Sequence, residues 1–598
     1  MTTTSAVELG AHPRPGGVVF GVFARAESCQ VEVTSPSGEP LATLALQAMG
    51  DGYHRGFVPG IGEGARYWFV VNGKRLPDPC ARSLPDGVHG AAQVVASHYA
   101  FRHRAPVRPL AQQVIYELHI GTFTEAGTFA AARERLPELA ELGITTLELM
   151  PLAAFAGEHG WGYDGVALFA PHAAYGSPDE LRELVDTAHG LGLNVLLDVV
   201  YNHFGPAGNY LSAFSPSYFR DDVRNAWGSA VNFEEPALRR LVLDNARYWL
   251  SEFQLDGLRL DATHAITDGS PTHILRELVE VAAELRPPRI LIAEDERNRA
   301  DLVSAVGLDG LWADDFHHQV RVTLTGESAG YYAAYDPSAQ GIADAINRGW
   351  LYTGQVSPVT GQARGTPAQA LAAESLVYCI QNHDQVGNRA LGDRFPLGEE
   401  FLGASLLLLF LPMTPLLFMG QEWGASSPFL YFTDHDAELG RLVTEGRRRE
   451  FAAFHEHDEP GNERVVPDPQ ARDTFLASKL RWSERTLGEH ARALALYRAA
   501  LQLRHTDPVL RGSTRAELSA HASEDVLIVQ RWLGNERRAL VFNLARRELS
   551  LADALAPSKL SSSRILLRSS PAADLVLPPF AAVVVAGQSD AAGTEASS

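Results

Sequence analysis

Four short segments carry acidic side chains directly after hydrophobic runs. In chain order they are residues 198–203, 257–262, 292–295 and 382–385. A hydrophobic strand that ends in a carboxylate, repeated along one chain, is typical of a (β/α)8 barrel, whose parallel strands bring their carboxyl ends to one rim. Three rim carboxylates, an arginine and two histidines are the groups that glycoside chemistry requires. The pattern therefore predicts a barrel enzyme that cleaves glycosidic bonds.

Two of these carboxylates are suited to the covalent chemistry. Retaining glycoside hydrolysis needs a carboxylate nucleophile and a second carboxyl that is protonated at the start. Asp261 is the predicted nucleophile, because Arg259 alternates onto the same face of its strand and a fixed cation there keeps Asp261 ionised. Glu294 ends the next predicted strand and is the predicted acid/base, with a pKa raised by burial and by the charge of Asp261.

Other polar and aromatic residues near the strand ends are predicted to bind the sugar. Asp384 is expected to hydrogen-bond the hydroxyls of a sugar ring and so to favour distortion of the ring toward the transition state. His203 and His383 are suited to hydrogen-bond that ring from opposite sides, and Tyr163 offers it a flat apolar face. The remaining substrate-binding candidates, chosen by position, are Arg259, His264, Asp295, Glu296, Asp315 and His317.

No metal or cofactor site is expected. His317 and His318 are adjacent, and adjacent side chains point apart in regular structure, which favours a sugar-contacting or solvated pair over a metal pair. Asp198 with Asn202 is a weak alternative for Ca²⁺, because no run of oxygen ligands at regular spacing surrounds them. A strand-end Asp such as Asp198 is also often a helix N-cap.

Composition narrows the range of partners. The 598-residue chain has 51 Lys and Arg against 72 Asp and Glu, a formal net charge of −21 at pH 7, so neither nucleic acid nor an anionic membrane is expected as a partner. Three cysteines are too few and too scattered for a disulfide framework or a zinc site, although a Cys29–Cys80 bridge stays open. The polar N-terminus lacks the apolar core of a secretory signal, so a cytoplasmic location is expected.

The pattern of turns and periodicity divides the chain into three folded parts. Residues 1–105 predict an N-terminal β-sandwich, 106–512 the catalytic barrel and 513–587 a C-terminal β domain, while the Ser- and Ala-rich residues 588–598 predict a disordered tail. The expected fold class is α/β, a (β/α)8 TIM barrel flanked by an N-terminal and a C-terminal β-sandwich domain.

Strand and helix patterns within the barrel give its elements. The eight strands are predicted at 114–119, 145–150, 194–200, 257–261, 290–294, 308–313, 376–382 and 415–419. Helices are predicted at 129–142, 178–191, 236–253, 272–285 and 489–504. The apolar run 402–419 is predicted as a buried helix and a buried strand, not a membrane span. Residues 204–235 are too long for an ordinary βα loop and predict an excursion over the active-site mouth, with Tyr210, Tyr218, Trp227 and Phe233.

The four acid-bearing segments resemble the four sequence regions of the α-amylase family of glycoside hydrolases, and the resemblance covers most of the chain. It implies that Asp261 is the nucleophile, Glu294 the acid/base and Asp384 the carboxylate that stabilises the transition state. The remaining motif positions are matched by Asp198, His203, Arg259 and His383.

Further segments resemble the members of this family that act on maltooligosyl chains ending in trehalose. These segments are residues 116–124, 294–298, 314–318, 324–327 with 330–332, and 420–424. The resemblance implies hydrolysis of the α-1,4 bond between the maltooligosyl chain and the terminal trehalose, with maltooligosyltrehalose as substrate and free trehalose as product. It also implies a trehalose-forming synthase that works beside the enzyme without a stable complex.

Two other functions stay open at this point. A 1,4-α-glucan branching enzyme would share the β domain, the barrel and the three carboxylates, because transfer differs from hydrolysis only in what attacks the glycosyl-enzyme; residues 294–298 and 314–318 argue against it. A non-catalytic glycan-binding protein would have lost a carboxylate, and Asp261, Glu294 and Asp384 are all present.

Overall fold

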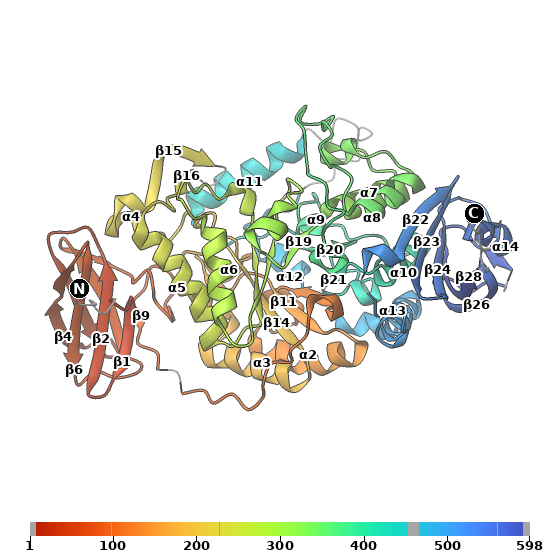
Figure 1. The fold of residues 1–598 in the computed structure, drawn as a ribbon. Coiled ribbons are helices and arrows are strands. Elements are labelled where there is room, and N and C mark those ends of the chain that lie inside the picture. The colour runs from red at the N-terminus through yellow and green to blue at the C-terminus, as the bar shows by residue number, and fades with distance from the viewer. Residues whose placement is uncertain are drawn as a thin grey trace.

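The computed structural model describes residues 7–96, 98–225, 228–452, 466–512, 514–558, 560–573 and 575–589. Antiparallel sheets come first, a closed parallel barrel follows, and an antiparallel sheet ends the chain. Figure 1 shows the first and last parts at opposite ends of the barrel. The predicted fold class is therefore confirmed.

The N-terminal part is a sandwich of two antiparallel sheets. One sheet has the order β1 (Gly10–Arg14), β2 (Gly17–Phe23), β6 (Tyr53–Pro59) and β5 (Gln47–Gly50). The other has the order β4 (Pro40–Ala45), β3 (Cys29–Thr34), β7 (Arg66–Val71) and β8 (Lys74–Leu76), with β9 (Ala92–Gln93) also paired to β7. Asn72 and Gly73 connect β7 to β8 with φ of 47° and 79°, the left-handed backbone that a two-residue hairpin turn requires.

Eight parallel strands close the barrel, and each one falls where the sequence predicts it. They are β10 (Ile115–Leu118), β11 (Thr146–Leu149), β14 (Asn194–Val199), β17 (Gly257–Leu260), β18 (Ile290–Ala293), β19 (Gly310–Trp312), β20 (Leu376–Cys379) and β21 (Thr414–Phe418). The pairing of β10 with β21 completes the ring.

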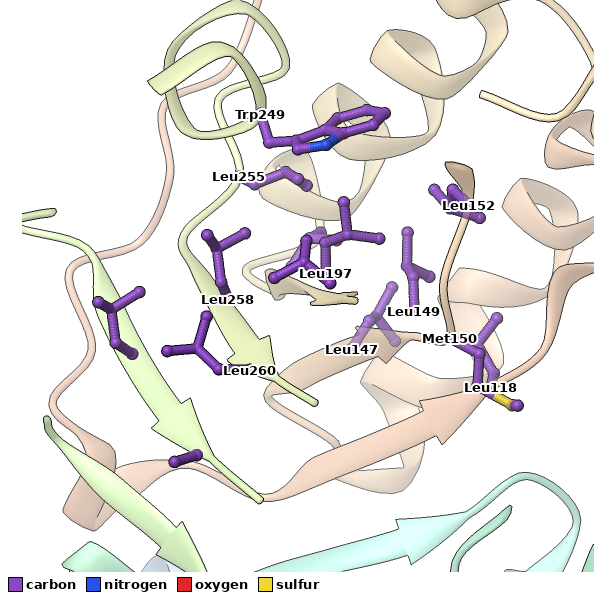
Figure 2. Packing of buried hydrophobic residues seen from close by; sticks show 14 of the residues in the cluster. Leu118, Leu147, Leu149, Met150, Leu152, Leu197, Trp249, Leu255, Leu258 and Leu260 are labelled. Carbon is purple, nitrogen blue, oxygen red and sulfur yellow. The ribbon is translucent and has the colours of Figure 1, made fainter. Parts of the chain in front are cut away.

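Alternation along the strands separates the barrel interior from its surroundings. Leu147 and Leu149 of β11 and Leu258 and Leu260 of β17 pack toward the surrounding helices, where Trp249 joins them (Figure 2). The intervening residues point inward. A separate apolar cluster from six of the eight strands fills the barrel interior, with Ile115, Leu196, Ile292, Trp312, Val377, Cys379 and Leu416. Polar residues at the inward-facing positions near the strand ends therefore point toward the rim of the barrel.

Helices surround the barrel as the amphipathic patterns predict. The predicted ones are α2 (Phe129–Leu142), α3 (Pro178–Gly190), α5 (Pro236–Glu252), α6 (Ile274–Glu284) and α13 (Gly488–Thr506). Others are α1 (Ile120–Phe123), α7 (Asp314–Thr325), α8 (Ala339–Arg348), α9 (His383–Gly387), α10 (Glu399–Phe410), α11 (Ala437–Ala452) and α12 (Arg472–Ala477). The apolar run 402–419 is the buried helix α10 followed by β21, as predicted. Among the described residues, no helix has the length and apolar character needed to cross a membrane.

The excursion after β14 contains α4 (Leu211–Phe214), β15 (Phe219–Asn225) and β16 (Gly228–Val231). Its aromatic residues pack on the N-terminal sandwich: the Tyr218 ring lies 5.5 Å from Phe23, and the Phe214 ring lies 6.4 Å from Phe69. These aromatic side chains therefore join two parts of the protein, a role that the sequence analysis did not foresee. Trp227 lies outside the described residues. A further hairpin, β12 (Ala153–Ala154) with β13 (Ala167–Pro171), follows β11.

The C-terminal part is a five-stranded antiparallel sheet with a smaller second layer. The sheet order is β22 (Leu518–Ser523), β23 (Val526–Leu533), β24 (Glu536–Asn543), β28 (Ala582–Ser589) and β26 (Leu560–Arg568). Over it lie the pair β25 (Leu549–Ser550) and β27 (Val576–Leu577), and α14 (Leu551–Leu555). Cys29, Cys80 and Cys379 are all buried and free. The predicted disordered tail lies, from residue 590 onward, outside the described residues.

Candidate active site

Arg259 is the charged centre of the rim and is fully buried. Its Nη1 atom donates to Asp261 at 2.7 Å and to both carboxylate oxygens of Asp198 at 2.9 and 3.0 Å. Its Nη2 atom lies 3.9 Å from Oε2 of Glu294. The indole of Trp312 covers the guanidinium at 4.3 Å. One cation thus faces the predicted nucleophile and the predicted acid/base at once, as the alternation on β17 indicated for Asp261.

Glu294 sits where its carboxyl is held protonated. Burial raises its pKa well above the ordinary value, and the charges of Asp261, Asp384 and Asp314 raise it further against the opposing charge of Arg259. The predicted direction of this pKa shift is confirmed. One of its oxygens accepts a hydrogen bond of 2.7 Å from the backbone N–H of Ala262.

That N–H is aimed by a strained turn. Ala262 adopts φ 39° and ψ 53°, a left-handed conformation that a residue with a Cβ rarely takes and that costs roughly 1–2 kcal/mol. The turn comes directly after the β17 strand, so it lets Asp261 face the rim while the next residue contacts Glu294. Thr263 extends the contact by donating to the Glu294 carbonyl at 3.0 Å. The strained backbone of Ala262 therefore helps to hold the carboxyls of Asp261 and Glu294 in a fixed arrangement.

His383 anchors a second, connected network beneath the rim. Its Nδ1 lies 2.5 Å from Glu117 Oε1, and its backbone N–H donates to Glu117 Oε2 at 2.9 Å. On its other side, Nε2 lies 2.8 Å from the Tyr163 hydroxyl, which itself donates to Asp198 at 2.5 Å. Both ring nitrogens face oxygen atoms that can accept a hydrogen bond, which favours the imidazolium form of the ring. Although burial opposes the charge, Asp384 and Glu117 raise the pKa of His383 to about 9.

The predicted sugar-binding residues fall into two groups. Tyr163, His203 and Asp261 lie together, since the His203 ring nitrogens lie 2.7 Å from Asn202 and 2.9 Å from the Tyr163 carbonyl, and Asn202 donates to Asp261 at 3.2 Å. Glu294, Glu296 and Asp384 instead line a cavity of about 650 Å³. Side-chain exposure rises from 0% for Arg259 through 13% for Glu294 to 38% for Asp384, which marks the direction of the mouth.

Three predicted substrate-binding residues lie beneath the cavity surface. The Asp295 side chain is fully buried and accepts hydrogen bonds from Arg297 and Thr263. The Asp315 side chain is also fully buried and is occupied by backbone and side-chain donors. His317 is buried as well. We therefore assign these three residues to positioning their neighbours, because none of their side chains lines the cavity.

His264 and Glu296 lie at the edge of the site. The Glu296 side chain is 71% exposed, and its Oε1 is 4.0 Å from Nε2 of His264. Both are accessible, so both stay candidates for contact with a ligand, and Glu296 is the better placed of the two because it lines the cavity.

Several residues of the site were not selected from the sequence. Asp314 lines the cavity in place of the predicted Asp315, because the phase of α7 could not be read from position alone. Of the pair His317 and His318, which was interpreted as sugar-contacting or solvated, His318 lines the cavity. Glu117 was missed although its signal is visible, since a carboxylate in the middle of a buried strand needs a partner. Glu148, its neighbour on β11, is buried with both oxygens unpaired, and burial raises its pKa well above the ordinary value.

Asp198 and Asn202, the residues considered as Ca²⁺ ligands, form hydrogen bonds to other side chains. Asp198 accepts from Arg259 and Tyr163, and Asn202 contacts Asp261 and His203. Within the described part of the chain, no group of three or more His, Cys, Asp or Glu side chains has an arrangement that would hold a metal ion.

Comparison with known proteins agrees with this geometry. Residues 81–227 match the family described as alpha amylase, catalytic domain. The chain is 49% identical to the malto-oligosyltrehalose trehalohydrolase of Deinococcus radiodurans, over 96% of each protein. It is 41% identical to the malto-oligosyltrehalose trehalohydrolase of a Rhizobium species, over 85% of this chain and 90% of the relative. A crystal structure of a Salmonella typhimurium protein, named among the alpha amylases, superposes with a TM-score of 0.88 at 37% identity and covers 98% of this chain and 100% of its own.

We expect the pairing of His383 with Glu117 to make the stability of the protein depend on pH. Because the folded pKa of His383, about 9, lies above the ordinary value of 6.5, the stabilisation is complete below about pH 6.5 and is lost as the pH rises through about 9. Glu117→Gln removes the carboxylate charge, so we expect a lower His383 pKa and a smaller loss of stability across that range. Denaturant midpoints measured at several pH values test this.

Glu134→Gln is the matched control, because Glu134 is exposed on α2. It should keep the pH dependence of the unmodified protein. An unchanged pH slope in Glu117→Gln would show that the pair does not hold His383 in its charged form.

Proposed function

The chain belongs to the malto-oligosyltrehalose trehalohydrolases of the α-amylase family, and from this membership we propose how its residues hydrolyse the α-1,4 bond that joins a maltooligosyl chain to a terminal trehalose. The enzyme is a glycoside hydrolase. The observation that carries the mechanism is the single buried guanidinium of Arg259, which faces the carboxyls of both Asp261 and Glu294.

The first step breaks the glycosidic bond. The Asp261 carboxylate attacks the anomeric carbon of the last glucose of the maltooligosyl chain and forms a glycosyl ester. The bond from that carbon to the 4-oxygen of trehalose breaks, and the Glu294 carboxyl gives its proton to this oxygen. The raised pKa of Glu294 supports this role, since the proton must be present before attack begins. Arg259, at 2.7 Å from Asp261, favours the ionised nucleophile.

The second step releases the shortened chain. A water molecule takes the place of trehalose, and the Glu294 carboxylate accepts one of its protons while the oxygen attacks the anomeric carbon. The ester bond to Asp261 breaks, and Asp261 leaves as a carboxylate. The enzyme then holds a shortened maltooligosaccharide, and both carboxyls have returned to their starting protonation states.

The glucose that reacts is proposed to lie between Tyr163 and Asp384. The Tyr163 hydroxyl is fixed by His383 and Asp198, which supports a stationary ring face for the sugar. Asp384 is the most exposed of the three carboxylates and accepts at 3.1 Å from Asn388, so its oxygens remain accessible to sugar hydroxyls. His203 completes this pocket from the side of Tyr163.

The leaving trehalose is proposed to occupy the cavity beside Glu294. Glu294 and Asp384 line this cavity, whereas Asp261, Tyr163 and His203 do not. Because the acid must reach the leaving oxygen, the cavity on its side of the site is where the leaving sugar belongs. We further propose that a trehalose-forming synthase supplies the substrate without a stable complex, because trehalose at the end of a maltooligosyl chain must first be formed there.

Product analysis with two substrates tests the proposed function. Maltotriosyltrehalose should give trehalose and maltotriose, while maltopentaose should be attacked slowly. Fast cleavage of both substrates would make the enzyme a general amylase-type hydrolase. Longer or branched products would make it a transferase, and either result would overturn the proposal.

Replacing the two reacting carboxyls separately tests their roles. Asp261→Asn should leave the fold intact and lower turnover by several orders of magnitude, because no glycosyl ester forms. Glu294→Gln should lower turnover of maltotriosyltrehalose by about 10²–10⁴-fold, the usual contribution of a general acid, yet it should still react with a maltooligosyl fluoride, whose leaving group needs no proton.

Asp525→Asn serves as the matched control, because Asp525 is exposed in a turn of the C-terminal sheet. It should turn over both substrates like the unmodified enzyme. Near-normal turnover in Asp261→Asn would refute the nucleophile assignment, and equal losses of Glu294→Gln on both substrates would refute the acid assignment.

Glu296 is proposed to recognise the trehalose end of the substrate. Glu296→Ala removes a charged acceptor at the cavity, which is typically worth a factor of about ten or more in binding. The ratio of kcat/KM for maltotriosyltrehalose to that for maltopentaose should therefore fall by about tenfold. Glu280→Ala, at an exposed position on α6, should leave the ratio unchanged. Equal losses on both substrates in Glu296→Ala would contradict the assignment.

A further inference from the structure

Another cavity, of about 740 Å³, opens at the end of the barrel opposite to the candidate active site. It is lined by residues that lead into three barrel strands: Gln112 precedes β10, Thr145 precedes β11 and Gly192 precedes β14. The last turn of α13 and the chain that follows it complete the lining. The proposed reacting carboxyls follow the far ends of parallel strands, so a ligand in this cavity would not contact them.

The ionisable side chains that line this cavity are all basic. They are Arg108, Arg504, His505 and Arg511, and the described lining residues include no aspartate or glutamate. The chain as a whole has a formal net charge of −21, so the charge of this cavity is opposite to that of the protein. A concave site with this charge raises the local concentration of anions.

Backbone carbonyls hold two of these basic groups. The Nη2 of Arg108 donates to the Gly192 carbonyl at 3.1 Å, and the Nε2 of His505 lies 2.8 Å from the Gly143 carbonyl. The Nε of Arg108 is buried and has no hydrogen-bond partner among the described residues. A carbonyl group has no net charge, so these contacts fix the directions of the side chains and leave the positive charge of Arg108 without a counterion.

Two buried arginines, Arg504 and Arg531, add positive charge to this end of the barrel. Both donate to backbone carbonyls within residues 409–413, and Arg531 also donates to the carbonyls of Leu510 and Gly512. Burial lowers the pKa of Arg504 to about 10, while burial and the neighbouring charge of Arg504 lower the pKa of Arg531 to about 9. Both guanidiniums remain charged at neutral pH, and a nearby anion would stabilise them.

The basic groups of the cavity lie close enough to influence one another. Burial lowers the pKa of His505, and the charges of Arg504, Arg108 and Arg511 lower it further, while the hydrogen bond to Gly143 opposes these effects. The guanidiniums that line the cavity therefore act on the same ring, which indicates that they form one cluster.

Asp507, which directly follows α13, is paired away from this cluster. Its Oδ2 accepts a hydrogen bond from the Nε of Arg538 at 2.8 Å. Its Oδ1 accepts from the backbone N–H groups of Val509 and Leu510 at 2.9 and 3.2 Å. Arg538 does not line the cavity, so the carboxylate charge of Asp507 is compensated by a residue outside it.

A phosphate group has the charge and the shape that these side chains recognise. It carries a charge close to −2 at neutral pH, and its oxygens match the planar fork of a guanidinium. The cavity is larger than one phosphate group, and its volume is in the usual range for sites of small organic molecules. Ile144, Leu191 and Leu510 give it an apolar lining that suits the carbon skeleton of such a molecule.

We propose that this cavity binds an organic phosphate, whose phosphate group contacts Arg108 and Arg511 and whose carbon skeleton lies against the apolar lining. The inference goes beyond the proposed function and does not rest on it. A phosphate bound here joins the entry segments of three barrel strands to the end of α13. Because it binds only the folded protein, it stabilises the fold and takes no part in the reaction.

Isothermal titration calorimetry of the full chain tests this site. The probes are inorganic phosphate, glucose 6-phosphate and adenosine monophosphate, each at an ionic strength kept constant with sodium chloride. Inorganic phosphate should bind saturably, and at least one of the two organic phosphates should bind more tightly. Tighter binding of glucose 6-phosphate identifies the ligand as a sugar phosphate, and tighter binding of adenosine monophosphate identifies it as a nucleotide; either result supports the proposal.

Arg511→Gln removes one of the two proposed phosphate contacts at an exposed position. The affinity for the tighter organic phosphate should fall about tenfold or more, as is usual when a hydrogen bond to a charged group is lost. Turnover of maltotriosyltrehalose should not change, because the cavity lies at the opposite end of the barrel. Arg108→Gln should weaken phosphate binding to a similar extent, and it decides the outcome if Arg511→Gln does not fold.

Arg546→Gln is the matched control, because Arg546 is exposed in the C-terminal part and does not line the cavity. It changes the net charge by the same amount and should bind each probe like the unmodified protein. Glucose without its phosphate is titrated as well, since glucose 6-phosphate could also enter the candidate active site as a sugar. Only the binding that is lost in Arg511→Gln and Arg108→Gln is assigned to the cavity.

Four results would overturn the proposal. One is unchanged affinity in both folded cavity variants. Another is an equal loss of affinity in Arg546→Gln, which would indicate a general effect of net charge. A third is binding of glucose as tight as that of glucose 6-phosphate, with no sensitivity to Arg511. The last is binding of both organic phosphates no tighter than that of inorganic phosphate, which would leave a simple anion site.

Discussion

The site depends on one buried cation in the barrel. Arg259 has no exposed surface, so its charge must be balanced by the side chains around it. Its Nη1 atom supplies three of those contacts, two to Asp198 and one to Asp261, and Trp312 covers its face. Removing both carboxylates would leave the charge of Arg259 uncompensated in the interior, which is far more unfavourable than losing a surface ion pair. The rim carboxylates therefore stabilise the charge of Arg259, and Arg259 stabilises theirs.

The position of Arg259 gives the carboxyls of Asp261 and Glu294 different electrostatic environments. Asp261 accepts a direct hydrogen bond from Arg259, whereas Glu294 lies 3.9 Å from it and is buried beside other acids, which raise its pKa. Two carboxyls with different environments can act as a nucleophile and an acid in one site. Glu117 and His383 form a second buried pair of opposite charges. The Tyr163 hydroxyl connects this pair to Asp198, because it contacts His383 and donates to Asp198. The two networks thus share Asp198.

The cavity side of the site is organised by a different carboxylate. Asp315 accepts hydrogen bonds from the side chains of Asn298 and Tyr335 and from the backbone of residues 351–352, and it forms an ion pair with Arg364. These contacts lie one layer beneath the residues that meet solvent. The residues that line the cavity are therefore held in place by a second set of residues that are buried behind them.

The sequence alone predicted the barrel and its eight strands, because the alternation of apolar residues along a strand is a local pattern. It also placed Asp261 and Glu294, the proposed reacting carboxyls, at the ends of two of these strands. It also indicated the partnership of Arg259 with Asp261, since two residues along one strand share a face. Tertiary structure decided what depends on contacts between distant segments. Glu117 meets His383 across 266 positions, and Arg364 meets the Glu296 carbonyl across 68. It also decided that Asp314 and His318 line the cavity while Asp315 and His317 do not, because the rotation of α7 is set by packing against the barrel, which no single residue in the sequence records.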